Sequence, residues 1–502
     1  MPADRPGAPG ETVERVLWIL STAAFLLGVA GDRAPLLRGP APYPPEWQWP
    51  LRDVPASGPL WPALAAAVVL VGLLALSARV APERGRRILL AGATVVGIAL
   101  PLGLAALEPD GALPTLFGRV AYRTATSYYT VALAPEAADP VEFLRQHHEL
   151  LPTFRKGAKH AATHPPGPVL VYRGLLALCD HAPGLTRAVL RVAGLPETNP
   201  RRPRPEYAPA ARAAGVLGGV LILIACVLTA WPVAALAADL GCGALPSARI
   251  GALWVLLPGP VLMLPQFDQA LALPVALSAV ALARALRVET RGALAWAVAS
   301  GLAGGVALFL SYGAPAFLAV GGLAVLAAAW ARGVPLRAAL ARAAVAFGAC
   351  AAAFALPALA GHHPIASAVE ALRIHREFFT LPRAYALWLV FDPLDLAVFL
   401  GVPVAVSLVW ATVVAARRLA ARAHPNADEA FRLAAMGALG ALILSGQTRG
   451  EVGRIWIPVM PVFVVAALAR PAEDRPSAAD ALLLAALLLP IDLLLALVWR
   501  FF

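Results

Sequence analysis

Charged residues are scarce in this sequence, and lysine is almost missing. Only 14% of the 502 residues are charged, and lysine occurs at two positions, Lys156 and Lys159. Soluble globular chains carry about a quarter of their residues as Asp, Glu, Lys and Arg, so this composition excludes an ordinary water-soluble domain. The net charge of +11 comes from arginine in short connections between apolar segments. That charge therefore reports membrane topology, and we expect no nucleic-acid partner.

Cysteine is also rare, and its spacing excludes two kinds of site. Four cysteines lie in or beside apolar segments, and no pair follows the Cys-x-x-Cys pattern: Cys179, Cys226, Cys242 and Cys350. The sequence therefore indicates neither a disulfide framework nor a zinc site. His147, His148, His160 and His164 fall close together, but their spacing does not match a helical pair of metal ligands. We expect no metal ion and no cofactor.

The sequence has apolar residues instead, at 60%, with a mean hydropathy of +0.72. Apolar segments long enough to cross about 30 Å of hydrocarbon recur along the whole chain. We therefore predict an all-α polytopic membrane bundle of about 12 to 14 transmembrane helices. The predicted spans are 13–30, 60–79, 88–107, 167–182, 211–236, 248–265, 269–287, 293–311, 314–331, 338–359, 391–416, 431–446, 454–469 and 478–499.

Arginine-rich connections predict which side of the membrane each loop faces. The positive-inside rule assigns such connections to the cytoplasm. They lie near 79–87, 284–291, 332–342 and 417–422. The segments predicted to share the opposite, outer face are 31–59, 108–166, 361–390 and 446–453.

One arginine-rich segment, 184–212, does not fit this alternation. Three predicted spans separate it from the cytoplasmic connection at 284–291, and an odd number of crossings cannot join two loops on one side. Two explanations stay open. Either the run interrupted by Pro258, Pro260 and Pro265 enters and leaves the membrane on one side, or segment 184–212 faces outward.

The predicted spans divide the chain into four parts. Residues 1–12 form a cytoplasmic tail, and 13–87 hold two spans with an outer loop between them. Residues 88–330 form the membrane core, in which the large outer loop 108–166 contains helices between the third and fourth spans. Residues 331–502 supply the C-terminal membrane helices. The bias toward alanine and arginine suggests a bacterial protein, so we expect a multi-pass protein of the bacterial plasma membrane.

The most rigid polar motif is Ala-Thr-His-Pro-Pro-Gly-Pro at 162–168, where the outer loop meets an apolar run. Proline fixes its own φ and keeps the preceding residue out of the α region, so His164 is predicted to be extended just before a helix begins. The unpaired amides of a helix start suit an anion, and an imidazole beside them can donate a hydrogen bond or move a proton. The alternative is an ordinary helix-start turn with an exposed histidine.

Both lysines lie just upstream of this turn. Lys156, Lys159 and His160 belong to a cationic cluster that suits the phosphate of a membrane lipid. The alternative is a basic collar whose side chains merely reach toward water. Asp139 stands directly before Pro140, where it either caps a helix or acts as a carboxylate base.

Two further charged sites lie at the ends of later spans. Arg449, Glu451 and Arg454 precede the span at 454–469, and they either neutralise one another or hold an anionic ligand. Asp268 is a lone acid between two apolar runs. Because an acid at the membrane edge is costly, we expect it to have a functional or pairing role.

Three of these features together resemble the GT-C superfamily of polytopic glycosyltransferases. They are the long outer loop that ends in a His-Pro-Pro turn, the Pro-x-x-Asp at 265–268, and the charged outer motif that runs into a late span. The nearer relatives are the protein O-mannosyltransferases and the lipid A aminoarabinose transferases. The resemblance covers roughly 88–330 and 446–461.

The resemblance implies transfer of a sugar from a polyprenyl-phosphate donor on the non-cytoplasmic face, without a metal. Asp139 is then the candidate base and His164 the second catalytic residue, placed with Lys159 on the phosphate. Because neither early outer loop has an adjacent Asp-Glu pair, Asp32 and Glu46 are alternative bases. The expected substrate contacts are Lys156, Lys159, His160, Tyr129, Asp268, Arg449, Glu451 and Arg454.

Two other functions stay open at this point. One is a transporter or flippase of a lipid-linked or anionic substrate, although such proteins usually show paired halves with matching broken helices. The other is a polymerase or ligase of surface polysaccharide, which also uses arginine and histidine in its outer loops. The sequence does not identify the sugar, and the acceptor is a glycan, a lipid or a protein.

Overall fold

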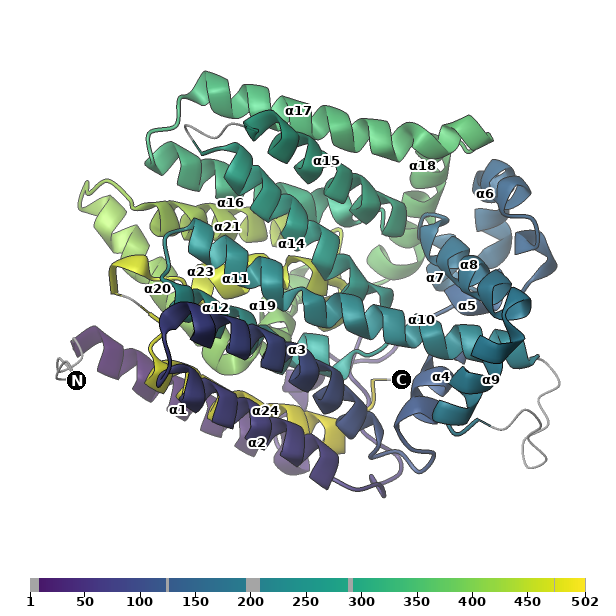
Figure 1. The fold of residues 1–502 in the computed structure, drawn as a ribbon, viewed down its shortest axis with the longest axis horizontal. Coiled ribbons are helices and arrows are strands. Elements are labelled where there is room, and N and C mark those ends of the chain that lie inside the picture. The colour runs from purple at the N-terminus through teal and green to yellow at the C-terminus, as the bar shows by residue number, and fades with distance from the viewer. Residues whose placement is uncertain (1–8, 123–125, 196–207, 288–291, 474, 502) are drawn as a thin grey trace.

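The computed structural model describes residues 9–122, 126–195, 208–287, 292–473 and 475–501. These residues form helices throughout, and the described chain contains no β-strand, only the isolated bridges Leu51–Trp499 and Arg470–Arg475. The predicted all-α polytopic bundle is confirmed (Figure 1).

Nine helices in the described chain are long and apolar enough to cross a membrane, so the protein is a multi-pass membrane protein. They are α1 (Pro9–Val29), α3 (Pro82–Ala105), α10 (Pro209–Leu228) continued by α11 (Ala230–Asp239), α14 (Phe267–Ala285), α15 (Ala293–Leu310), α16 (Ala314–Ala331), α17 (Leu336–Ala355), α20 (Val402–Ala420) and α24 (Ala478–Val498). Three shorter apolar helical stretches accompany them: α2 (Trp61–Ser77), α12 (Ala244–Leu253) with η4 (Trp254–Leu256), and η7 (Ile457–Val459) with α23 (Met460–Leu468).

Some predicted spans are divided or too short in the structure. Segment 167–182 forms α8 (Gly167–His181), and its 15 residues reach only about 22 Å at 1.5 Å per residue. Segment 391–416 is split at Gly401, whose φ of 86° ends α19 (Tyr385–Leu400) before α20 begins. Because a hydropathy average does not register a single residue such as Gly401, segment 391–416 was predicted as one span.

The position of α9 (Pro183–Val192) favours one of the two explanations for segment 184–212, that it faces outward. This helix packs against α8 and α10 at the end of the bundle that holds the other loop helices, on the right in Figure 1. From there the chain crosses three times, through α10 and α11, through the broken stretch from α12 to α13 (Pro258–Leu262), and through α14. With the arginine connections inside, α9 therefore faces outward. Arg201, Arg202 and Arg204 lie outside the described residues.

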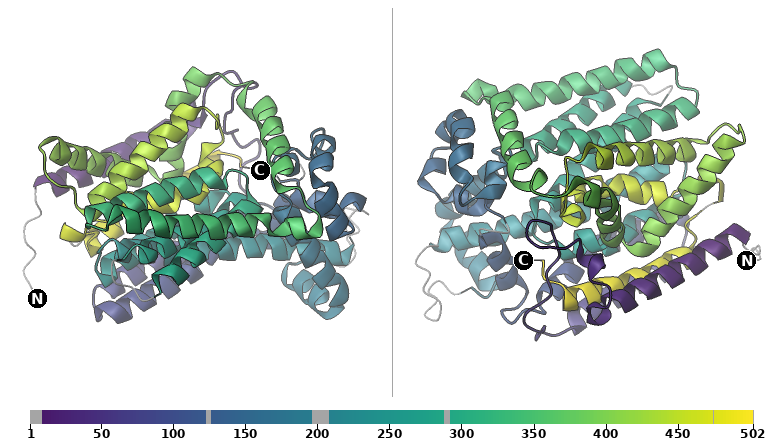
Figure 2. Two further views of the ribbon diagram at one scale, coloured as in Figure 1. Left: turned by 90° about the horizontal axis from the view of Figure 1, so that it is seen from above. Right: turned by 180° about the vertical axis from the view of Figure 1, so that it is seen from behind.

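The large outer loop forms a cap of short helices, as predicted. These are α4 (Ala112–Ala121), α5 (Tyr128–Ala132), η3 (Pro135–Ala137), α6 (Pro140–Phe154) and α7 (Lys159–Ala162). The outer segment 361–390 adds α18 (Pro364–His375) and the π-helix η6 (Arg376–Thr380), and α18 packs beside α6 (Figure 2).

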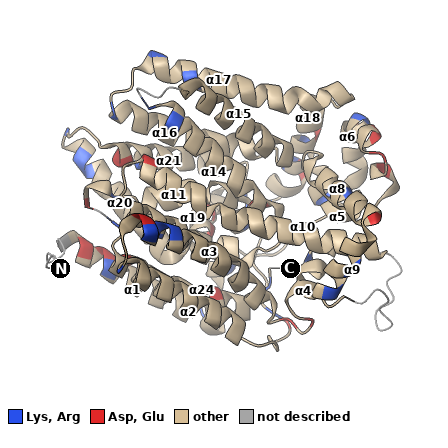
Figure 3. Ribbon diagram, in the orientation of Figure 1, with Lys and Arg blue, Asp and Glu red and all other residues tan. Residues whose placement is uncertain are grey.

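The first and last parts of the chain lie side by side. Helix α1 packs against α20 and α24, and Trp18 Nε1 donates to Ser407 Oγ at 2.7 Å. Near the cytoplasmic end, the buried Glu14 accepts from Arg470 at 2.8 Å and from Arg475 at 3.0 Å. Charged residues mostly lie near helix ends, while the middle of the bundle contains few of them (Figure 3). Residues 13–87 are thus packed into the same bundle as 331–502.

Candidate functional site

A cavity of about 740 Å³ lies at the end of the bundle that the arginine pattern predicts to face outward. Its walls come from α5, α7, the beginnings of α14 and α16, α18 with η6, and the turn that leads into α22 (Val452–Ile455). Three segments predicted to share the outer face, 108–166, 361–390 and 446–453, therefore meet around it. The fourth, 31–59, packs behind it, where Glu46 accepts hydrogen bonds from Ala384 N at 2.9 Å and Trp388 Nε1 at 2.7 Å.

Arg454 connects three polar side chains in the cavity. Its Nη2 lies 2.8 Å from Glu451 Oε2, and its Nε lies 3.9 Å from Asp268 Oδ2. Its Nη1 lies 3.1 Å from His160 Nε2. Since a guanidinium only donates, His160 accepts through Nε2 and carries its proton on Nδ1. Burial also lowers the pKa of His160 well below its usual value, so this ring is neutral.

In His164, in contrast to His160, the ring nitrogen that contacts the protein is Nδ1. Nδ1 lies 2.9 Å from the carbonyl oxygen of His160, which can only accept, so Nδ1 carries the proton and Nε2 is left as an acceptor. Burial lowers the pKa of His164 to about 3, more than the backbone contact raises it. At neutral pH His164 therefore accepts a hydrogen bond, for example from a hydroxyl group, and it does not act as a cation.

The His-Pro-Pro turn is rigid for a second reason besides its prolines. A Cβ on Gly167 would lie 2.0 Å from the carbonyl oxygen of Phe309, so only glycine lets α8 begin this close to the end of α15. The ring of Tyr128 covers the turn from the other side, with its centroid 5.3 Å from that of His164. Burial raises the pKa of Tyr128 well above 10, which keeps the phenol protonated.

The turn at 446–451 is tied to the elements around it. Arg449 donates to the carbonyl oxygens of Thr380 at 3.2 Å and Arg383 at 2.7 Å. On the other side, the amide of Gly453 donates to Asp395 Oδ2 of α19 at 2.8 Å. Glu451 lies between these anchors in the left-handed region, with φ 58°, which is unusual for a residue other than glycine. The anchors thus hold a strained residue whose carboxylate orients Arg454.

The cavity carries an excess of positive charge. Five arginines and two acids line it. Arg373 is paired with Glu370 and Glu377, which lie outside the lining, whereas Arg376 forms no ion pair within the described chain. The guanidinium of Arg449 contacts carbonyl oxygens and lies over the ring of Tyr385 at 5.3 Å, so it is not neutralised by a carboxylate. The excess favours an anionic ligand. Apolar side chains, among them Phe317, Leu372 and Leu442, line the same cavity, so an amphipathic anion fits best.

Six of the predicted site residues meet in this cavity: His160, His164, Asp268, Arg449, Glu451 and Arg454. Four do not belong to its described lining. Asp139 is exposed and caps α6, where it accepts from Val141 N at 2.9 Å. Lys156 and Lys159 are exposed outside the cavity. Tyr129 is buried, and its hydroxyl donates to the carbonyl oxygen of Ala211 at 2.8 Å.

The alternative bases also have structural partners. Asp32 forms an ion pair with Arg38 at 2.9 Å, and Glu46 supports segment 384–388 as described above. The carboxylates that the structure brings into the cavity are those of Asp268 and Glu451. Glu451 is engaged by two arginines, whereas Asp268 has one longer contact, with Arg454 at 3.9 Å.

Sequence reasoning missed the arginines of 373–383. Arg373, Arg376 and Arg383 line the cavity, where the two lysines were expected. Arg373 is paired with Glu370 and Glu377, and Arg383 with Glu451, so Arg376 is the one of the three without an ion pair in the described chain. One signal was available, because three arginines in a segment predicted to face outward run against the positive-inside rule. Tyr128, the neighbour of the predicted Tyr129, was also missed; a pair of adjacent tyrosines does not show which one faces a cavity.

The four neighbouring histidines of the outer loop separate into two places. His160 and His164 enter the cavity, whereas His147 contacts Ser367 Oγ at 3.1 Å and His148 stacks near His363. Among the residues that the structure describes, no group of three or more His, Cys, Asp or Glu side chains is arranged to hold a metal ion.

Comparison with known proteins finds no matching family model, no matching curated protein and no matching solved structure.

Proposed function

We propose that the protein is a membrane glycosyltransferase that takes a sugar from a polyprenyl-phosphate donor at the outer face of a bacterial plasma membrane. One observation carries the proposal. A single cavity combines the carboxylate of Asp268, the neutral acceptor nitrogen of His164 and an apolar wall. It also holds Arg376 and Arg449, which have no carboxylate partner in the described chain. The resemblance of the outer-loop motifs to the GT-C superfamily supports the same class of substrate.

The proposed reaction uses these groups in distinct roles. An acceptor hydroxyl attacks the anomeric carbon, the bond from that carbon to the phosphate oxygen breaks, and polyprenyl phosphate leaves with the electron pair. Asp268 takes the hydroxyl proton, and His164 Nε2 orients the acceptor by accepting a hydrogen bond. Arg376 and Arg454 stabilise the charge that develops on the leaving phosphate. The polyprenyl chain lies along the apolar side chains of α16 and α21 (Ala427–Ser445).

The test compares Asp268 with Asp139, since the sequence alone did not show which of these two acids is the base. Asp268→Asn removes the base while keeping the size of the side chain, and we expect turnover of a labelled polyprenyl-phosphate sugar to fall roughly 10²- to 10⁴-fold. Asp139→Asn keeps the helix cap and lies outside the cavity, so we expect turnover near that of the unaltered protein. The assay uses native membranes, which contain the acceptor.

Two outcomes would count against the proposal. If Asp268→Asn turned over the donor at the unaltered rate, Asp268 would not be the base. If the protein in vesicles moved the lipid-linked sugar across the bilayer and left the bond between sugar and phosphate intact, it would be a transporter.

A further inference from the structure

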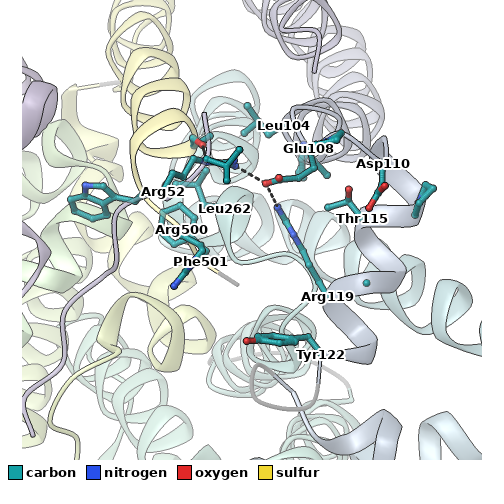
Figure 4. A pocket seen from close by; sticks show the side chains of 18 of the residues that line it. Arg52, Leu104, Glu108, Asp110, Thr115, Arg119, Tyr122, Leu262, Arg500 and Phe501 are labelled. Atoms are coloured by element: carbon teal, nitrogen blue, oxygen red, sulfur yellow. Dashed lines mark hydrogen bonds and ion pairs between the residues drawn. The ribbon is translucent and has the colours of Figure 1, made fainter. Parts of the chain in front are cut away.

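A second cavity, of about 400 Å³, lies at the same end of the bundle (Figure 4). It is formed by segment 52–54, the end of α3, helix α4, residues 261–262 and the C-terminal end of α24 with residues 499–501. Its described lining has no residue in common with the main cavity. None of the predicted site residues lines this second cavity, and the proposed transfer reaction does not involve it.

The charges that line this second cavity are matched, unlike those of the main cavity. Three arginines and three acids line it. Figure 4 shows Glu108 between Arg52 and Arg119, with Oε1 of Glu108 at 2.7 Å and 4.0 Å from their guanidinium nitrogens. Arg500 forms an ion pair with Asp53. An anion would have to compete with these carboxylates for the arginines. A neutral ligand with hydroxyl groups can donate to the carboxylates and accept from the guanidinium groups at once.

An aromatic ring and a hydroxyl complete the lining. Tyr122 is 54% exposed, and its ring lies in the lining next to Arg119, while Thr115 contributes a hydroxyl from α4. An exposed aromatic ring offers a flat apolar surface, and charged pairs beside it offer donors and acceptors. A pyranose ring has the matching pair of surfaces, an apolar C–H face and a rim of hydroxyl groups. We propose that this second cavity binds a neutral sugar.

The two cavities are joined by one short segment of chain. Leu262 lines the second cavity and Asp268 lines the main one, and Arg119 Nη1 donates to the carbonyl oxygen of Leu264 between them at 2.9 Å. Arg119 therefore connects the second cavity to the segment that carries the proposed base. The bound sugar then belongs to the acceptor, an assignment that rests on the proposed transferase function. The binding itself does not depend on that function.

The experiment measures sugar binding directly, without any transfer reaction. The full-length protein is placed in lipid discs without glycolipids, and glycoside detergents are avoided because their head groups are competing sugars. Saturation-transfer NMR is recorded with methyl α-glucoside, methyl α-mannoside and inorganic phosphate as probes. Tyr122→Ala removes the stacking surface, and we expect it to weaken binding of the glycosides roughly two- to tenfold. Tyr43→Ala is the matched control, because Tyr43 is 59% exposed and lies outside the described lining of both cavities.

A second variant tests the charge matching. Glu108→Gln keeps the shape of the side chain but removes one negative charge from beside Arg52 and Arg119, so we expect glycoside binding to weaken and phosphate binding to appear. The proposal is overturned if neither glycoside binds the unaltered protein, if Tyr122→Ala binds as tightly as Tyr43→Ala, or if phosphate displaces the glycosides. Asp268→Asn should bind the glycosides normally. Glycoside binding without donor turnover would therefore reject the proposed function and leave this site standing.

Discussion

Asp139 and Asp268 show how neighbouring backbone decides the role of a single residue. Asp139 precedes Pro140 at the start of α6, and its carboxylate accepts from the amides of Val141 and Glu142 at 2.9 Å and 3.3 Å. Asp268 begins α14 as well, but the capping box there is made by Gln266 and Gln269, which leaves the Asp268 side chain in the cavity. One acid is thus used by its own helix, and the other is available to a ligand.

At the residue scale we predict that Asp139→Ala destabilises the outer cap without altering the cavity. Loss of an N-cap costs about 1 kcal/mol of helix stability, because the first amides of α6 lose their acceptor. Limited proteolysis of the cap measures this effect, and cleavage within α6 should become faster. Asp139→Asn keeps a capping side chain and is the control. Equal cleavage rates for the two variants would contradict the capping role.

At the scale of elements, α19 determines the shape of the 446–454 turn. Asp395 accepts from Trp49 Nε1 and from Gly453 N, both at 2.8 Å, so one side chain joins the first outer loop to the turn that carries Arg454. Asp392 accepts from Gly450 N at 3.4 Å, one helical turn earlier. Both acids are buried. Their positions explain how Glu451 keeps its left-handed backbone conformation.

Under the proposed transferase function, we predict that Asp395→Ala weakens donor binding more than it slows the chemical step. Both buried donors lose their acceptor, which costs about 1 to 3 kcal/mol for each group, and the turn loses its anchor. The donor concentration at half-maximal rate should rise roughly tenfold or more, with a smaller change in the rate at saturation, because Asp268 and His164 lie on other elements.

Ser407→Ala is a suitable control for this variant. It also removes a buried acceptor from a tryptophan, Trp18 Nε1, but between α1 and α20. It should lower stability without changing the half-saturating donor concentration. If both variants changed that concentration equally, Asp395 would have only a general structural role.

At the scale of the whole molecule, the end predicted to face outward contains a set of neutral histidines, of which His147 and His362 are buried and the others half-buried. Burial lowers the pKa of His147 and of His164 to about 3, and it also lowers the pKa of His160, His362 and His375. In the unfolded chain a histidine takes up a proton near pH 6.5. Between about pH 6.5 and 3 the unfolded state therefore binds more protons, and stability falls as the pH is lowered.

We predict that the thermal stability of the protein in lipid discs decreases between about pH 7 and pH 5, and that His147→Gln reduces this decrease. Glutamine retains a partner for Ser367 but does not titrate, so one of the contributing groups is removed. His181→Gln, at an exposed position on α8, is the control and should follow the unaltered protein. Identical pH slopes for all three proteins would show that His147 does not contribute.

The sequence by itself determined the class of protein and the end of the bundle at which its polar residues gather. Apolar length and the location of arginine are local properties, so they predicted the multi-pass helical bundle and the outer face shared by 108–166, 361–390 and 446–453. They also predicted six residues of the cavity, because charged or rigid motifs at membrane edges are costly unless they have a role.

Only the tertiary structure decided which of those residues meet. Asp139, Lys156 and Lys159 looked equivalent to Asp268 and Arg454 in the sequence, yet helix capping and the packing of α6 turn the first three toward solvent. Arg376 and Arg383 enter the cavity because α18 folds back beside α6, and Arg52 and Arg500 meet because α24 ends beside the first outer loop. The proximity of these residues depends on contacts between segments that are distant in the sequence. Hydropathy and motif spacing carry no information about such contacts.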